Sequence, residues 1–320
     1  MPTVCPQTLF SAALARRELL LTEGAIIERL HRASDPAIAP DPDAANASLL
    51  YTTTGIAALS GLWRGYVDIA QAHDLGIIVC TPTWRANPER LARAKLPSVR
   101  QVSADAVALL AEIRASYGLF GQRIFIGGLM GCKGDAYAPR EALDSNSAER
   151  FHSEQAYALA QAGADFLLAA TLPAFSEALG LAQALSKVGI PYLLSFVLRP
   201  DGTLLDGLPV ADAITRIDEA VAPAPSAYLA NCVHPVNFLA ALSAADLARP
   251  GIAKRLVGLQ GNGSQKSPEE LDGALHLETD SPDAFAAAMR VVRERFDSHI
   301  IGGCCGTDEH HISALAENCL

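Results

Sequence analysis

Two adjacent cysteines lie in a glycine-rich turn near the C-terminus, in the sequence Gly302-Gly303-Cys304-Cys305-Gly306. Adjacent cysteines cannot easily form a disulfide with each other, and the glycines leave both sulfurs free to face one object. Thiolates select soft ions such as Zn²⁺ over Mg²⁺ or Ca²⁺. The motif therefore indicates a zinc site, and a flexible turn with two bystander cysteines is the alternative.

Zinc requires at least three protein ligands, so a further ligand must come from elsewhere in the chain. The best source is Asn231-Cys232, which directly follows the apolar run Ala227–Ala230. His234 lies close by in the sequence, and we expect it to border the metal without binding it. The other cysteines are expected to be packing, loop or surface thiols: Cys5, Cys80, Cys132 and Cys319.

The composition restricts the setting of this site. The chain has 320 residues, of which 50 % are hydrophobic, and a net charge of −10 without a lysine- or arginine-rich run. It can bury a large core, and its charge argues against a nucleic-acid partner. It contains neither an apolar stretch long enough for a membrane helix nor a signal-peptide pattern. An odd number of scattered cysteines is typical of reduced thiols, so we expect a cytoplasmic protein without a membrane partner, and homo-oligomer formation stays open.

Short, nearly continuous apolar runs alternate with alanine-rich stretches of helical spacing. The runs are Leu19–Leu21, Ile77–Cys80, Ile124–Ile126, Phe166–Ala169, Tyr192–Phe196, Tyr228–Ala230, Leu256–Leu259 and His299–Ile301. The stretches include Ala104–Tyr117, Ser153–Gln161, Phe175–Lys187, Pro209–Ala220 and Ser281–Arg295. Apolar strands separated by helices indicate a parallel sheet covered on both faces. Eight such units predict a single-domain (β/α)₈ TIM barrel over residues 1–320, with an open doubly wound sheet as the alternative.

A barrel of this kind would bring the cysteines together. In such barrels the chemistry lies on the loops at the C-terminal ends of the strands. Cys232 follows the sixth apolar run by two residues, and Cys304 and Cys305 follow the eighth run. We therefore predict that the three cysteines meet at the same rim of the barrel.

The type of ligand limits what the metal can do. Three thiolates on Zn²⁺ give a net charge of −1, which makes the metal a poor activator of water. Such a site is suited to holding an exogenous thiol as a thiolate, which is a soft nucleophile for attack on an electrophilic methyl group. A structural zinc is the competing interpretation. It would need a fourth protein ligand, and none is evident unless His234 or another cysteine serves.

At this point the chain resembles the homocysteine S-methyltransferase family, whose barrel carries Asn-Cys after one strand and Gly-Gly-Cys-Cys after the last. Four other segments are similar to the family: Thr81–Asn87, Gly127–Gly131, Phe151–Gln155 and Ala164–Leu168. The resemblance implies that Cys232, Cys304 and Cys305 bind zinc and that the partners are a small-molecule thiol and a methyl donor. The residues predicted to bind substrate are Glu23, Gly24, Thr81, Arg85, Thr171 and Asn231.

The acceptor pocket departs from the family pattern. The family's first strand ends in Asp-Gly-Gly, where this chain has Thr22-Glu23-Gly24, and Ala170 stands at the position of a family glutamate. Both acidic groups match the ammonium of an amino acid acceptor in the relatives. Arg85 is a cation at a position where relatives often carry a small or aromatic residue. We therefore predict a preferred thiol acceptor other than homocysteine, one that lacks the α-amino group. Arg85 would bind an anionic group of this acceptor. Glu23 could change this in two ways, either by neutralising Arg85 or by binding an amine from a new direction.

The predicted activity is a zinc-dependent transfer of a methyl group from a small-molecule donor to homocysteine or a related thiol. Folate or corrinoid donors would usually need additional modules, which 320 residues do not accommodate. A non-catalytic zinc- and thiol-binding barrel and a lyase or hydrolase that uses the same metal are the alternatives. No separate general base is predicted, because a thiol bound as a thiolate has already released its proton.

Overall fold

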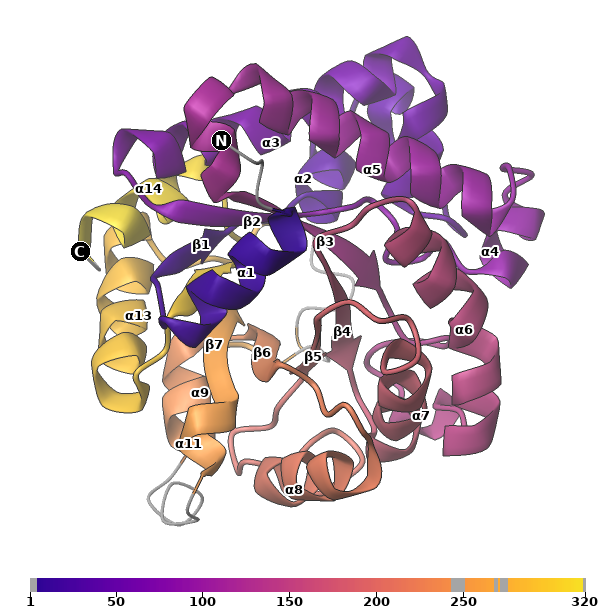
Figure 1. The fold of residues 1–320 in the computed structure, drawn as a ribbon. Coiled ribbons are helices and arrows are strands. Elements are labelled where there is room, and N and C mark those ends of the chain that lie inside the picture. Colours follow the sequence, from indigo (N-terminus) through magenta and orange to yellow (C-terminus); the bar gives the residue numbers. More distant parts are fainter. Residues whose placement is uncertain (1–4, 243–250, 268–269, 271–275, 319–320) are drawn as a thin grey trace.

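Eight parallel strands close into a barrel in the order β1 to β8, with β8 pairing back to β1 (Figure 1). The structure is a computed structural model and describes residues 5–242, 251–267, 270 and 276–318. The strands are Leu20–Thr22 (β1), Gly76–Cys80 (β2), Ile124–Met130 (β3), Phe166–Leu172 (β4), Tyr192–Phe196 (β5), Ala227–Val233 (β6), Leu256–Gly261 (β7) and Ile300–Gly303 (β8). Each overlaps a predicted apolar run. The prediction of a barrel is therefore confirmed, and the alternative of an open doubly wound sheet is wrong.

Helices cover the sides and one end of the barrel (Figure 1). They are Pro6–Ala15 (α1), Ile27–Arg32 (α2), Thr53–Ala72 (α3), Pro88–Arg93 (α4), Val99–Ser116 (α5), Ser145–Gln161 (α6), Phe175–Leu185 (α7), Val210–Ala220 (α8), Pro235–Ala241 (α9), Ile252–Arg255 (α11), Pro282–Phe296 (α13) and Glu309–Asn318 (α14). Short 3₁₀ turns cover Pro36–Ile38, Asn46–Tyr51, Gly118–Arg123 and Pro139–Glu141. Among the described residues, no helix has both the length and the apolar character needed to cross a membrane.

Two of the predicted helices begin earlier than their apolar periodicity indicates, and capping residues explain why. The side chain of Ser98 accepts a hydrogen bond from the Gln101 N–H, so α5 begins at Val99. Asp144 caps the Ser147 N–H in the same way, so α6 begins at Ser145. Such caps satisfy N–H groups that have no partner within the helix.

The core has two layers. One lies between the strands and the surrounding helices, and the other fills the inside of the barrel. At the N-terminal end of the barrel, α1 lies across the opening and adds Phe10 to the inner layer (Figure 1). The Phe10 ring stacks on Phe166 with centroids 3.9 Å apart, and its edge meets Phe125 at 5.6 Å. This end of the barrel is therefore closed, and the opposite end is left for chemistry.

Replacing Phe10 with alanine should destabilise the barrel by about 3–5 kcal/mol, because it leaves a cavity between two aromatic rings. Phe10 is completely buried. The midpoint of urea unfolding measures the effect. Leu119→Ala is the matched control, since Leu119 is 88 % exposed and its truncation should leave the midpoint unchanged. An unchanged midpoint in Phe10→Ala would show that α1 does not support the barrel.

Candidate metal centre and acceptor pocket

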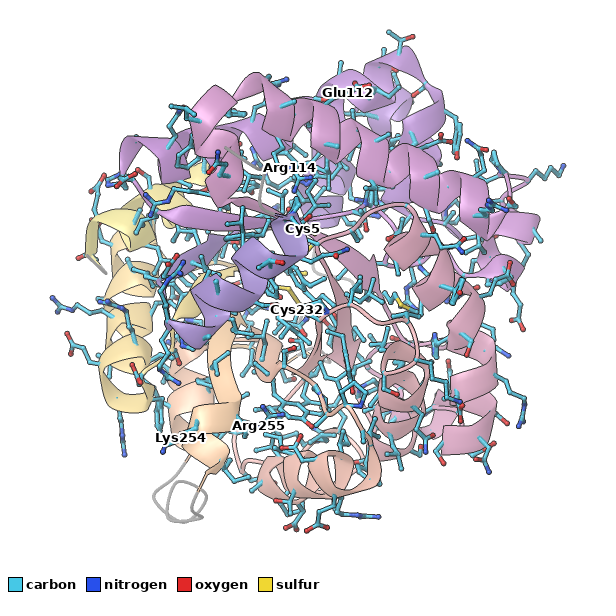
Figure 2. All side chains as sticks on the ribbon, viewed as in Figure 1. Cys5, Glu112, Arg114, Cys232, Lys254 and Arg255 are labelled. Carbon is cyan, nitrogen blue, oxygen red and sulfur yellow. A yellow bond between two sulfur atoms is a disulfide. The ribbon has the colours of Figure 1, made fainter. Side chains whose placement is uncertain are left out.

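Three cysteine sulfurs meet at the C-terminal end of the barrel and lie within 4.8 Å of one another. Cys232 is the penultimate residue of β6, whereas Cys304 and Cys305 directly follow β8. Cys232 therefore lies inside a strand that is longer than its apolar run. In Figure 2 it is near the middle of the ring of strands.

Two of these cysteines are joined by a disulfide in the structure. Cys232 and Cys304 form the bond, with Cα atoms 5.5 Å apart, and the Cys305 sulfur lies 4.0 Å from that of Cys232. The sequence pattern predicted free thiols for both partners. Oxidation and metal binding exclude each other here, because only a reduced sulfur can serve as a thiolate ligand.

The cysteine cluster fits a soft metal ion once the disulfide is reduced. Three sulfurs that each lie about 2.3 Å from one tetrahedral ion would be roughly 3.8 Å apart. The 4.0 Å between the sulfurs of Cys232 and Cys305 is close to that spacing. Cys305 is exposed in the structure, and an ordinary cysteine thiol has a pKa of about 8.5. The free thiol therefore keeps its proton at neutral pH, and a bound metal would displace it.

The other described cysteines and His234 lie outside this cluster. Cys80 and Cys132 are buried, and Cys5 is exposed. Cys319 lies outside the described residues. The ring nitrogens of His234 are both engaged, since one accepts a hydrogen bond from the Val236 N–H and the other lies 3.0 Å from Asp280 Oδ2.

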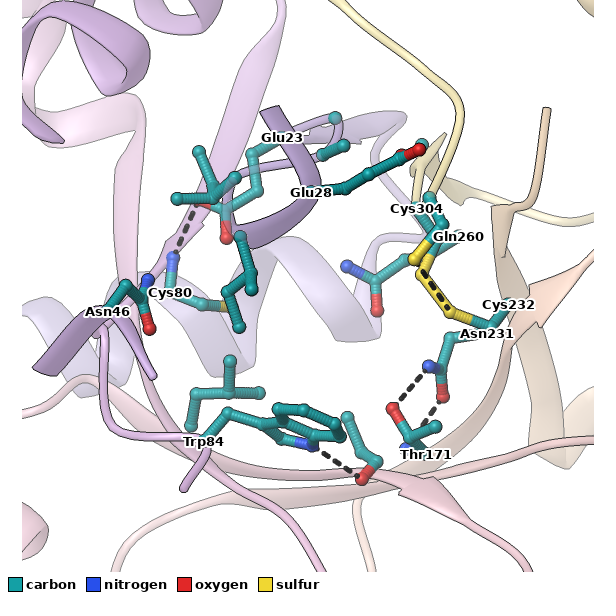
Figure 3. Close-up of a pocket in the computed structure, with 18 of the residues that line it drawn as sticks. Glu23, Glu28, Asn46, Cys80, Trp84, Thr171, Asn231, Cys232, Gln260 and Cys304 are labelled. Carbon is teal, nitrogen blue, oxygen red and sulfur yellow. Dashed lines mark hydrogen bonds between the residues drawn. A yellow bond between two sulfur atoms is a disulfide. The ribbon is translucent and has the colours of Figure 1, made fainter. Parts of the chain in front are cut away.

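A cavity of about 540 Å³ opens beside the cysteines (Figure 3). Five of the six residues predicted to bind substrate line it: Glu23, Gly24, Thr81, Thr171 and Asn231. The structure also adds Trp63, Trp84, Tyr137 and Gln260 to the wall. Gln260 directly follows the seventh apolar run, so the strand-end rule could have found it. Trp84 lies in a segment that the family resemblance had marked, whereas Tyr137 lies in an irregular loop that gave no periodic signal.

Arg85 is the predicted substrate-binding residue that does not line the cavity. Its guanidinium lies 4.0 Å from the centroid of the Trp84 indole ring, in a cation–π arrangement. It donates hydrogen bonds to the backbone carbonyls of Cys132 and Gly134. Arg85 therefore fixes the loop that follows β3, while its neighbour Trp84 faces the cavity.

Glu23 is a buried carboxyl group in the cavity wall. It is 8 % exposed, and its Oε2 accepts hydrogen bonds from Trp63 Nε1 at 3.0 Å and from the Cys80 N–H at 3.1 Å. Within the part of the chain that the structure describes, no cationic side chain forms an ion pair with it. Burial raises the pKa of Glu23 to about 8, and the two hydrogen bonds oppose that rise. The group is therefore largely neutral at pH 7.

A second acidic residue, Glu28 of α2, holds the cysteine turn. Its carboxylate accepts a hydrogen bond from the Gly306 N–H and forms an ion pair with Arg32 at 2.8 Å. The Cys304 N–H donates to the Gly261 carbonyl at 2.7 Å, which ties the same turn to β7. The turn that carries Cys304 and Cys305 is thus held from both sides.

A buried acid also anchors the loop that carries Tyr137. Glu177 accepts hydrogen bonds from the N–H groups of Lys133 at 2.7 Å and Leu143 at 3.3 Å, which lie at the two ends of that loop. His152 Nε2 lies 2.9 Å from the same carboxylate, and both side chains are almost completely buried. The loop over the cavity is therefore held from beneath by side chains of α6 and α7.

A model of the family described as homocysteine S-methyltransferase matches residues 20–319 of the chain. The chain belongs to this family. This confirms the resemblance that rested on the Asn-Cys and Gly-Gly-Cys-Cys motifs.

Two curated members of the homocysteine S-methyltransferase family are similar to parts of the chain. Homocysteine S-methyltransferase YbgG of Bacillus subtilis (strain 168) is 28 % identical over 207 residues, which cover 64 % of this chain and 60 % of that protein. Homocysteine S-methyltransferase of Escherichia coli (strain K12) is 36 % identical over 111 residues, or 34 % of each chain. The matched region thus spans less than two thirds of either relative.

Solved structures of the Escherichia coli homocysteine methyltransferase MmuM share the fold. Its oxidised form matches with a TM-score of 0.73 and 22 % identity, over 98 % of this chain and 99 % of that chain. Its metallated form matches with a TM-score of 0.71 and 21 % identity, over 97 % and 99 %. At this level of identity the likeness concerns the barrel architecture.

The raised pKa of Glu23 makes stability depend on pH. Folded Glu23 keeps its proton up to about pH 8, whereas an unfolded glutamic acid loses it near its ordinary pKa of 4.5. The folded state therefore binds one more proton between these values, so the contribution of Glu23 to stability falls as the pH rises.

Glu23→Gln should remove this dependence. The stability of wild type relative to the variant should fall by up to about 1.4 kcal/mol per pH unit between pH 5 and pH 8. Urea unfolding of both proteins at these two pH values measures the difference. A constant difference would mean that Glu23 has an ordinary pKa.

Proposed function

We propose that this protein is a thiol S-methyltransferase that binds Zn²⁺ through Cys232, Cys304 and Cys305. The observation that carries the proposal is the cluster of three sulfurs within 4.8 Å, next to a cavity of about 540 Å³. Membership of the homocysteine S-methyltransferase family supports the reaction, and the metallated form of MmuM supports a metal at this site. A cavity of this size suits a thiol acceptor and a small-molecule methyl donor.

Zinc held by three thiolates would lower the pKa of the acceptor thiol and keep its sulfur nucleophilic. In the transfer, a bond forms between the acceptor sulfur and the methyl carbon, while the bond from the donor to that carbon breaks and leaves its electron pair on the donor. The acceptor's proton leaves on binding, so no side chain has to act as a base. Trp84, Leu129 and Ala170 give the cavity apolar walls against which the carbon atoms of the acceptor can pack. Because the ligands must be reduced, we also propose a cytoplasmic location.

We further propose that the acceptor carries an amine, which Glu23 binds. The expectation of an acceptor without an amine depended on the missing acidic groups at Thr22 and Ala170 and on Arg85 at the barrel mouth. The guanidinium of Arg85, however, lies on the loop after β3. Glu23, by contrast, lines the cavity and forms no ion pair with a cationic side chain in the described part of the chain, while Arg32 in the same wall is paired with Glu28. An ammonium group would supply the missing positive charge and favour the ionised carboxylate. Ala170 adds no second charge on the opposite wall.

Replacing Cys304 with alanine should strip the metal from the reduced protein, because two thiolates are fewer than zinc requires. We expect about one zinc per chain in wild type and far less in the variant. Metal analysis after reduction and dialysis measures this. Cys132→Ala is the control and should keep full zinc content, since Cys132 is buried outside the cluster. Full occupancy in Cys304→Ala would remove this residue from the ligand set.

The activity itself is tested with a panel of thiols and small sulfonium donors, with methylated product detected by mass spectrometry. We expect methyl transfer by the zinc-loaded protein and none by Cys304→Ala. Binding of zinc and thiol without any methylated product would favour the non-catalytic alternative.

Glu23→Gln tests the choice of acceptor. The change should lower kcat/KM for homocysteine by roughly 10- to 100-fold, which corresponds to loss of one charged hydrogen bond. Activity toward the desamino analogue should change little. Equal losses for both acceptors would show that Glu23 does not bind the amine.

A further inference from the structure

Two neighbouring parts of the barrel rim contain residues in an unfavourable backbone conformation. Thr171 in β4 and Cys232 in β6 have positive φ angles of 61° and 53°. Such angles are uncommon for residues with a Cβ and are disfavoured most for β-branched ones. Each residue is the penultimate one of its strand, and the pairing register of each strand shifts at that point. Both strands therefore contain a bulge just before they end.

The bulge in β6 explains how two consecutive residues come to face the cavity. Side chains normally alternate along a strand. Leu229 belongs to the cluster inside the barrel and Ala230 to the layer under the helices. Alternation would then put Asn231 inside and Cys232 outside. Both line the cavity, because the bulge turns the Cys232 side chain back toward the barrel axis.

The bulge in β4 has the same effect. Ala170 belongs to the cluster inside the barrel, so alternation would direct Thr171 outward. Thr171 nevertheless lines the cavity, as Ala170 does. The two bulges therefore lie on either side of β5 at the rim and face the same space.

The side chain of Asn231 links the two bulges (Figure 3). Its Oδ1 accepts hydrogen bonds from the Thr171 N–H at 2.9 Å and from the Ser195 hydroxyl at 2.7 Å. Its Nδ2 donates to Thr171 Oγ1 at 2.8 Å. All three residues are buried, with 3 %, 6 % and 0 % exposure for Asn231, Thr171 and Ser195. Both the backbone and the hydroxyl of Thr171 are thus held by the residue that precedes Cys232.

We infer that Asn231 is a positioning residue that holds Cys232 in its bulge and so sets where its sulfur lies. This role replaces the substrate-binding role expected for Asn231 and Thr171, since their polar groups bond to each other. Without these bonds, β6 can relax to a regular strand in which Cys232 turns away from Cys304 and Cys305. The inference rests on the metal centre proposed above, but the position of the sulfur can also be tested without metal.

The first measurement is the zinc affinity of the reduced protein, determined by competition with a chromophoric chelator. Asn231→Ala should weaken zinc binding about 10- to 100-fold, as expected for loss of a group that orients a ligand. Thr171→Val removes only the hydroxyl and should weaken binding less. Ser195→Ala is the matched control. It removes one bond to the same Asn231 oxygen without touching the link between the bulges, so the affinity should stay within about twofold of wild type.

The Co²⁺-substituted proteins provide a spectroscopic signature. The sulfur-to-cobalt charge-transfer band reports how many thiolates bind, and it should weaken in Asn231→Ala but persist in Ser195→Ala. Thermal unfolding of the metal-free proteins checks that the variants are folded. If Asn231→Ala does not fold, Thr171→Val carries the test. Wild-type zinc affinity and an unchanged cobalt spectrum, together with a raised KM for the thiol acceptor, would overturn the inference.

A metal-free measurement separates this inference from the proposed function. In a glutathione buffer, the Cys232 and Cys304 thiols lose two protons and two electrons as their disulfide forms, and oxidised glutathione is reduced to two thiols. The disulfide-bonded fraction, measured by mass spectrometry, should be lower in Asn231→Ala than in wild type and Ser195→Ala. If wild type binds no zinc but this difference appears, the proposed function fails and the role of Asn231 stands. An unchanged fraction means that Asn231 does not position Cys232.

Discussion

The close approach of β1 and β8 is the constraint on which the site depends. Leu20 and Leu21 pair with Ile300 and Ile301, which closes the barrel. Beyond this pairing the strands come so near that a Cβ on Gly302 would overlap the Thr22 side chain. The glycines before the two cysteines are therefore a packing requirement as well as a source of freedom for the turn. The same approach brings Glu23 to the cavity that the cysteines line, so the proposed acceptor contact and the proposed metal ligands share one space.

Much of the fold could be predicted from the sequence. A buried parallel strand is a short run of apolar residues, and such a run can be recognised without knowing which strands it pairs with. The rule that chemistry lies at the C-terminal ends of such strands was enough to group Cys232, Cys304 and Cys305. The inner role of α1 could not be predicted, since nothing in its periodicity shows which end of a barrel it covers. The oxidation state of Cys232 and Cys304 could not be predicted either, because it depends on the redox conditions around the protein and not on the order of its residues.

The directions of individual side chains were harder to predict than their positions along the chain. Simple alternation would separate Asn231 from Cys232, and only a bulge allows both to face inward. Arg85 shows the opposite problem. The rule about strand ends correctly placed the segment that contains Arg85 at the rim. Trp84, however, is the residue of that segment that lines the cavity, and the Arg85 guanidinium donates hydrogen bonds to backbone carbonyls on a neighbouring loop. Local backbone geometry and competition among partners decide such outcomes, and neither can be read from spacing.

The pairing of the last three strands also bears on the order of events during folding. Cys232 belongs to β6, whereas Cys304 and Cys305 follow β8, so the full set of sulfurs exists only after β6, β7 and β8 have paired. Contacts between such distant parts of a chain form late, because a long loop must be closed first. Uptake of a thiolate-seeking ion would thus report pairing of the last three strands rather than formation of the individual βα units.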